Sequence, residues 1–275
     1  LLPMTAILLM LGDSLIDSGN VSRASDGPVL GEQIALAMGG DLADQQLFPM
    51  DNPPVPSRAQ IHNYAHGGAE SGLSPQLDGQ RGVVPTGFRS QVKAARRYAD
   101  FYRQTKDVDV LISAGANDVL SMIEEADSLA AVVETPQRFD DRRLMRSTAR
   151  SITRNLRRGV DRLTGFVDEV AVVGAYPLTD TPLVHDLLNE LDPMPANRLL
   201  TLVEGIGRKV QKRLERRYGM DSSVAVIDLQ QSWEAIPEPS FVDEVHPSST
   251  ASAQLAPVIL NAVSGELSSF GFNNA

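Results

Sequence analysis

The chain has 275 residues, of which 42% are hydrophobic and 22% charged, and this length and composition suit a folded protein with a buried core. Its formal net charge of −10 argues against nucleic acid as the main partner, because phosphate contacts need a basic face. The absence of cysteine excludes disulfides and zinc sites built from thiolates.

The sequence pattern predicts no targeting segment and no boundary between domains. Residues 1–11 are apolar but carry neither a basic leader nor a small-residue cleavage site, so we do not interpret them as a signal peptide. No apolar run approaches the roughly 18 residues of a membrane helix, which predicts no transmembrane segment. Because we find no internal repeat and no low-complexity linker, we expect one domain over residues 1–275.

The first structural signal is an apolar run at residues 6–11, followed by Gly12, Asp13 and Ser14. A continuous apolar run of this length is typical of a buried strand in a parallel sheet. Gly12 permits a sharp turn where the strand ends. Ser14 then lies just past the carboxyl end of the strand, where open α/β sheets bind their ligands. The alternative is that Gly-Asp-Ser is only a turn with favourable turn chemistry.

Alternating strands and helices follow. The pattern predicts helices at residues 28–38, 90–104, 144–163, 199–214 and 251–263, and further strands at 61–64, 108–112, 167–173 and 224–229. Proline and glycine predict loops at 41–58 and 74–87, and we also expect loops at 180–195 and 230–242. The last helix is expected to bend or break near Pro257. This alternation predicts a parallel sheet of five strands covered by helices on both faces.

Unusual polar residues follow three of the predicted strands. They are Ser14, the pair Gly67 and Gly68, and Asn117. A fourth cluster, residues 243–247, comes after the last strand. Because the carboxyl ends of parallel strands open on one edge of a sheet, we expect these residues to converge on a single site.

The residue types in this set suit acyl transfer. A serine needs a base to become a nucleophile at neutral pH, and His246 is the best candidate because Asp243 lies three residues before it. One helical-type turn would bring that acid and that histidine to the same side. Three donors could stabilise an oxyanion: the backbone N–H of Ser14, the backbone N–H of Gly68 and the side-chain amide of Asn117.

At these positions the sequence resembles the GDSL family of ester hydrolases and lipases, also called SGNH hydrolases. Residues 12–15 (Gly-Asp-Ser-Leu) with 17–20 (Asp-Ser-Gly-Asn) are similar to the first block of the family, in the variant found in many bacterial members. Residues 63–69 resemble the second block, 115–118 the third and 243–247 the fifth. The likeness runs from about residue 6 to residue 263.

The resemblance implies a three-layer α/β/α, flavodoxin-like fold with a parallel five-stranded sheet. It implies that Ser14 is the nucleophile, that Asp243 and His246 complete a catalytic triad, and that Gly68 and Asn117 join the Ser14 N–H in the oxyanion hole. Gly67 is the alternative to Gly68, which we prefer because it falls five residues after Asn63 as in the family block. No metal or cofactor is implied, and the sequence shows no cluster of metal ligands.

Several other residues near these motifs have alternative interpretations. His66 could line the pocket or act as a second base. Trp233 and Phe241 could wall an acyl pocket, although packing in the core is the simpler role. We expect Asp13 and Asp118 to hold loops through backbone hydrogen bonds rather than to take part in the chemistry.

We therefore expect a serine ester hydrolase that acts on a small-molecule or lipid ester. Acyl transfer to an alcohol and carbohydrate acetylesterase activity are alternatives within the same chemistry. A binding module that keeps the fold without catalysis is the alternative from another class, and the intact Ser14, Asp243 and His246 count against it.

Overall fold

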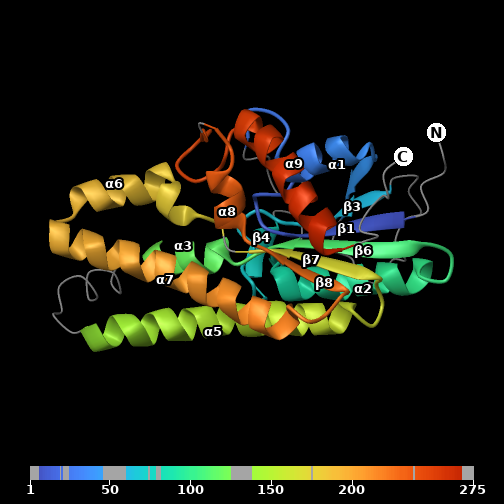
Figure 1. Ribbon diagram of the computed structural model, residues 1–275, viewed down its shortest axis with the longest axis horizontal. Helices are drawn as coiled ribbons and strands as arrows, with labels where there is room; N and C mark the ends of the chain where they lie inside the picture. Colours follow the sequence, from blue (N-terminus) through green and yellow to red (C-terminus); the bar gives the residue numbers. More distant parts are fainter. Residues whose placement is uncertain are drawn as a thin grey trace.

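The computed structural model describes residues 6–18, 20, 25–45, 60–73, 75–78, 82–124, 138–174, 176–237 and 239–267. Within these residues a parallel sheet of six strands runs through the molecule in the order β2-β3-β1-β6-β7-β8 (Figure 1). The strands are β1 (Ala6–Gly12), β2 (Leu42–Asp44), β3 (Ile61–Asn63), β6 (Asp107–Ser113), β7 (Glu169–Val173) and β8 (Val224–Ile227).

Strand β1 lies in the interior of this sheet because its residues are apolar on both faces. All seven are buried, and the strand pairs with β3 on one side and β6 on the other. Leu9 lies opposite His62 in β3 and Val110 in β6. A strand with no polar face belongs between two helical layers, as parallel sheets require.

Helices cover both faces of the sheet (Figure 1). On one face lie α1 (Leu30–Met38), α8 (Leu229–Glu234) and α9 (Ser249–Glu266), and on the other lie α2 (Phe88–Tyr102), α5 (Arg138–Leu163) and α7 (Pro193–Tyr218). The prediction of an α/β architecture with a parallel sheet between helical layers is therefore confirmed. None of the helices in the described part of the chain is long and apolar enough to cross a membrane.

The prediction of five strands is wrong, because the sheet of the described chain has six. The additional strand, β2, falls in the region expected to be loop and has only three residues, paired with β3 through Ala43 and His62. A strand this short shows no alternation that a sequence pattern could detect. Residues 46–58 of that expected loop lie outside the described chain.

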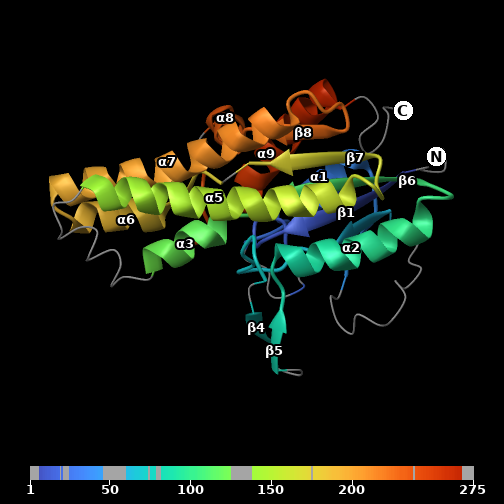
Figure 2. The same ribbon diagram turned by 90° about the horizontal axis from the view of Figure 1, so that it is seen from below.

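Three other regions expected to be loops also contain regular structure. Strands β4 (Pro75–Asp78) and β5 (Gly82–Pro85) form an antiparallel hairpin that projects from the body of the molecule in Figure 2. Helix α6 (Pro182–Glu190) begins with Thr181 as its N-cap and a proline in its first turn, and the six-residue α8 is capped by Asp228. These caps and the N-terminal proline are genuine helix-start signals that the analysis of apolar spacing overlooked.

Helix α3 (Ala116–Glu124) was also not expected, and it matters for the site. It follows β6 after two residues, so it begins at the carboxyl edge of the sheet. Helices α5 and α7, of 26 residues each, extend past the sheet on the same side as α3 and α6 (Figure 2). Helix α9 is not broken at Pro257 and continues to Glu266.

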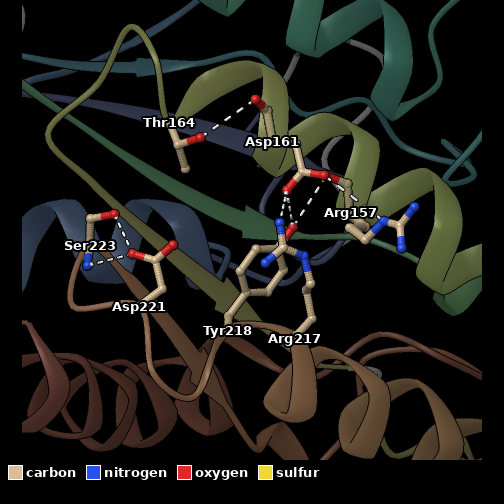
Figure 3. A network of polar contacts seen from close by, with 7 residues as sticks. All are labelled: Arg157, Asp161, Thr164, Arg217, Tyr218, Asp221 and Ser223. Carbon is tan, nitrogen blue, oxygen red and sulfur yellow. Dashed lines mark hydrogen bonds and ion pairs between the residues drawn. The ribbon is translucent and has the colours of Figure 1, made fainter.

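The carboxyl-terminal ends of α5 and α7 are joined by a polar network (Figure 3). The hydroxyl of Tyr218 donates a hydrogen bond to Asp161 at 2.9 Å and one to the backbone oxygen of Arg157 at 3.3 Å. The same carboxylate lies 3.4 Å from the guanidinium of Arg217. The ion pairs are about half exposed and contribute little, so the buried Tyr218 is the main polar link at this end of the two helices.

The turn after β1 places a carboxyl group in the interior. A Cβ on Gly12 would lie 2.0 Å from the backbone oxygen of Ser113, so only glycine fits where β1 meets β6. The next residue, Asp13, is 3% exposed, and its carboxylate accepts a hydrogen bond from the backbone N–H of Leu15. Burial, with a smaller contribution from the charge of Asp118, raises the pKa of Asp13 to about 7, against the opposing effect of the Leu15 hydrogen bond.

This raised pKa predicts how stability depends on pH. Between about pH 4 and pH 7 the unfolded chain ionises Asp13 while the folded protein still holds the proton, so rising pH favours the unfolded state. Asp13→Asn keeps the acceptor and removes the ionisation. The free energy of unfolding of the wild type should therefore fall relative to that of the variant by roughly 4 kcal/mol at most across this range, and remain constant above it.

Urea denaturation of both proteins at pH 4.5, 6 and 8 measures this difference. All other groups titrate in both proteins, so their contributions cancel in the comparison. A difference in stability that is the same at all three pH values would show that Asp13 is ionised throughout.

Candidate active site

Ser14, His246 and Asp243 form a continuous line of hydrogen bonds at the carboxyl edge of the sheet. Ser14 lies in the turn after β1, and its Oγ is 2.7 Å from Nε2 of His246. Nδ1 of the same ring is 2.7 Å from Oδ2 of Asp243. If the proton of the imidazole is on Nδ1, the ring donates to the carboxylate and accepts from the serine hydroxyl at the same time. The three residues expected to act together therefore meet.

Asp243 is held by the loop that carries it. Its Oδ1 accepts hydrogen bonds from the backbone N–H groups of Val245 at 2.8 Å and His246 at 2.7 Å, while Oδ2 faces the ring. Burial alone would raise the pKa of this carboxyl, but these hydrogen bonds outweigh it and lower the pKa. Asp243 is therefore a carboxylate at neutral pH.

The loop is not the helical turn that the spacing suggested. Phe241 and Pro247 form an antiparallel bridge, and the backbone N–H of Val242 donates to the oxygen of His246 at 2.9 Å. The side chain of Asp243 closes the turn inside this bridge by capping two backbone N–H groups. Such a turn is typical of Asp, whose short side chain reaches the backbone two and three residues ahead.

The second predicted motif forms a tight turn after β3. Gly68 has a φ of +73°, a left-handed conformation that favours glycine. The N–H of Gly67 donates to the carboxylate of Asp17 at 2.7 Å, so that amide is already engaged by the first motif.

Asn117 is the second residue of α3, so it lies within the helix and not at its N-cap. Its Nδ2 donates to the backbone oxygen of Ala69 at 3.1 Å, which ties α3 to the turn that carries Gly68. The next residue, Asp118, accepts hydrogen bonds at 2.7 Å from both the backbone N–H and the hydroxyl of Ser71. Asp118 thus holds a loop through a backbone hydrogen bond, as expected.

A pocket opens beside Ser14 between α3 and the loop of Asp243. Its lining consists of Asp13, Ser14, Leu15, Ala116, Asn117, Leu120, Tyr176, Val245, His246 and Pro247. Gly68 is not among these residues. Its neighbour Ala69 accepts a hydrogen bond from Asn117, which does line the pocket. The walls are mostly apolar, and the polar groups are those of the expected chemistry together with Asp13 and Tyr176.

The structure decides between the alternatives for three aromatic residues. His66 is buried outside the pocket lining, with Nδ1 2.9 Å from the backbone oxygen of Tyr64, and burial lowers its pKa. Trp233 and Phe241 pack against each other, with ring centroids 5.4 Å apart, and neither lines the pocket. Packing, the simpler role expected for the two rings, is therefore confirmed, and the alternative that His66 lines this pocket is wrong.

Tyr176 is the pocket residue that the sequence analysis missed. It follows β7 and reaches the same edge of the sheet as Ser14. The signal was available, because a bulky aromatic residue directly after a predicted buried strand occupies the edge where ligands bind. Among the residues that the structure describes, no cluster of three or more His, Cys, Asp or Glu side chains could hold a metal ion.

Comparisons with solved structures found similar folds at low identity. The chain is similar to TesA, at 13% identity, with a TM-score of 0.47 over 95% of this chain and 99% of that one. It is also similar to Axe2, titled an acetyl xylan esterase from Geobacillus stearothermophilus, at 18% identity, with a TM-score of 0.47 over 94% of each chain. A family 3 carbohydrate esterase from Clostridium thermocellum is 14% identical, with a TM-score of 0.44 over 94% of this chain and 95% of that one.

At these TM-scores and identities, the likenesses carry no argument about activity or substrate. No curated protein matches the chain. The assignment comes instead from the family model of GDSL-like lipases and acylhydrolases, which matches residues 8–259 and so spans all the motifs described above. The chain belongs to the GDSL-like lipase/acylhydrolase family of ester hydrolases.

Proposed function

We propose that this protein is a serine hydrolase of carboxylic esters, in which Ser14, His246 and Asp243 act as a catalytic triad. The observation that carries the proposal is the line of hydrogen bonds from Ser14 Oγ through the imidazole to Asp243, with both contacts at 2.7 Å. Each member holds the position that its role requires: a nucleophile beside a base, and a base oriented by a carboxylate.

In the proposed reaction, Ser14 Oγ attacks the carbonyl carbon of the ester and passes its proton to Nε2 of His246. Asp243 stabilises the resulting imidazolium from the other side of the ring. When the tetrahedral intermediate collapses, His246 gives that proton to the leaving alcohol and an acyl-enzyme remains. The same imidazole then takes a proton from the water that attacks the acyl-enzyme, and it returns this proton to Ser14 Oγ when the acyl–oxygen bond breaks and the acid leaves.

The oxyanion would be bound by the backbone N–H groups of Ser14 and Gly68 and by the side chain of Asn117. One N–H of the Asn117 amide bonds to Ala69, and the second is proposed to serve the oxyanion. Asn117 lines the pocket together with Ser14 and His246, which supports this role. Such donors accelerate the reaction because they are already aimed where negative charge develops.

The triad proposal predicts strongly non-additive losses. Ser14→Ala and His246→Ala should each lower kcat/KM for a short nitrophenyl ester by about 10⁴-fold or more, and the double variant should be little worse. A fluorophosphonate should label wild-type Ser14 and neither variant. His185→Ala, which removes an exposed histidine on α6, is the matched control and should retain both activity and labelling.

Two results would contradict the triad. One is a double variant whose loss equals the product of the two single losses, since independent groups multiply. The other is a mass-spectrometric assignment of the phosphonate to Ser18, Ser71 or Ser113.

The role of Asn117 can be separated from a structural one. Asn117→Ala should lower kcat by about 10²- to 10³-fold with little change in KM, because it removes a donor used mainly in the transition state. Asn155→Ala is the matched control: Asn155 donates to Ser71 in the same loop at 3.1 Å but does not line the pocket. That control should lower the melting temperature and leave kcat within a few-fold. Near-normal turnover in Asn117→Ala would contradict this catalytic role and leave Asn117 with a structural one, its hydrogen bond to Ala69.

A further inference from the structure

The pocket lining includes a buried polar group that the proposed chemistry does not use and that has no hydrogen-bond partner in the described chain, the hydroxyl of Tyr176. The residue is 9% exposed, and its oxygen is buried without a hydrogen-bond partner in the described chain. Buried hydroxyls are nearly always hydrogen-bonded, so an unpaired one calls for an explanation. Because Tyr176 lines the pocket beside Ser14 and His246, a molecule in that pocket could provide the missing partner.

The ring of Tyr176 is fixed in place, so its hydroxyl is not free to turn toward another partner. Trp233 of α8 packs edge-on against it, with ring centroids 5.7 Å apart and an interplanar angle of 76°. Trp233 is itself 1% exposed and contacts Phe241 in the loop that leads to Asp243. The ring of Tyr176 is thus held at a defined place beside the pocket, as a binding residue must be.

The charges around this hydroxyl indicate what kind of group it would bind. Burial raises the pKa of Tyr176, and the negative charges of Asp180, Asp13 and Asp243 add to this effect. The hydroxyl therefore stays protonated and can both donate and accept a hydrogen bond. The same negative potential disfavours an anionic ligand, and among the groups of an ester substrate a neutral hydroxyl can both donate to and accept from this tyrosine.

We propose that the hydroxyl of Tyr176 binds a neutral hydroxyl group of the substrate close to the ester that Ser14 attacks. This inference rests on the proposed function, and it adds a substrate class: short esters that carry a hydroxyl group on the acyl or the alcohol side. The mostly apolar pocket would hold the short hydrocarbon part, and Tyr176 would distinguish a hydroxylated ester from its plain analogue.

Tyr176→Phe tests this with matched pairs of esters. Ethyl lactate and ethyl propionate differ by a hydroxyl on the acyl side, and 2-hydroxyethyl acetate and ethyl acetate differ by one on the alcohol side. In the wild type, we expect kcat/KM to favour the hydroxylated member of one pair. In the variant, this ratio should fall about three- to tenfold, as for the loss of one neutral hydrogen bond, and the affected pair identifies the side that Tyr176 reads.

The melting temperature gives a second test, because removal of a hydroxyl that stabilises the fold would lower it. Because the hydroxyl of Tyr176 has no partner, Tyr176→Phe should leave the melting temperature unchanged or raise it. Tyr218→Phe is the matched control, since that hydroxyl bonds to Asp161 and to the backbone of Arg157 (Figure 3). It should lower the melting temperature and leave both ester ratios as in the wild type.

Ratios unchanged in Tyr176→Phe for both pairs would overturn the inference, and so would a clear drop in its melting temperature. These outcomes leave the proposed function intact if the wild type hydrolyses the plain esters through Ser14. If the wild type hydrolyses none of the four esters and no nitrophenyl ester, the proposed function fails and this inference fails with it.

Discussion

The hydrogen bond between Ser14 and His246 joins two residues that are 232 positions apart in the chain. No local preference can bring them together, so the site depends on the sheet. β1 fixes Ser14 because all its residues are buried between two neighbouring strands, and its last residue must be glycine where it meets Ser113. At the other end of the chain, α9 packs against α1 and thereby holds the loop of His246 above the turn that follows β1.

The loops that carry the site are themselves linked by side chains of the recognised motifs. Asp17 of the first motif accepts a hydrogen bond from Gly67 of the second, and Asp118 of the third accepts two from Ser71. Asn117 adds a contact to Ala69. Each of these acids or amides pairs with a neighbouring loop rather than its own, so the turns cannot shift independently. Motif residues other than the proposed triad therefore hold the loops that position the reacting groups.

Two carboxyl groups at this edge of the sheet differ in their pKa values because their surroundings differ. Asp243 is partly exposed and accepts backbone hydrogen bonds, so its pKa is low and it stays charged beside the imidazole. Asp13 is buried beside Ser14 with one hydrogen bond from Leu15, and its pKa is about 7. Tyr176 experiences the charge of both. The same residue type thus has opposite protonation behaviour within one site, because burial dominates at Asp13 and hydrogen bonding at Asp243.

The sequence by itself determined the α/β architecture and the candidate residues of the site, because apolar periodicity marks strands and helices and the motifs stand at predicted strand ends. Ser14, His246 and Asp243 could be grouped on this basis alone, since parallel strands end on one edge. The tertiary structure decided what depends on contacts between distant segments: the pairing of the short β2, the burial of Asp13, the bond from Asn117 to Ala69, and the place of Tyr176 in the pocket. None of these follows from local pattern, because pairing, burial and an unpaired hydroxyl are each set by the atoms that the folded chain brings alongside.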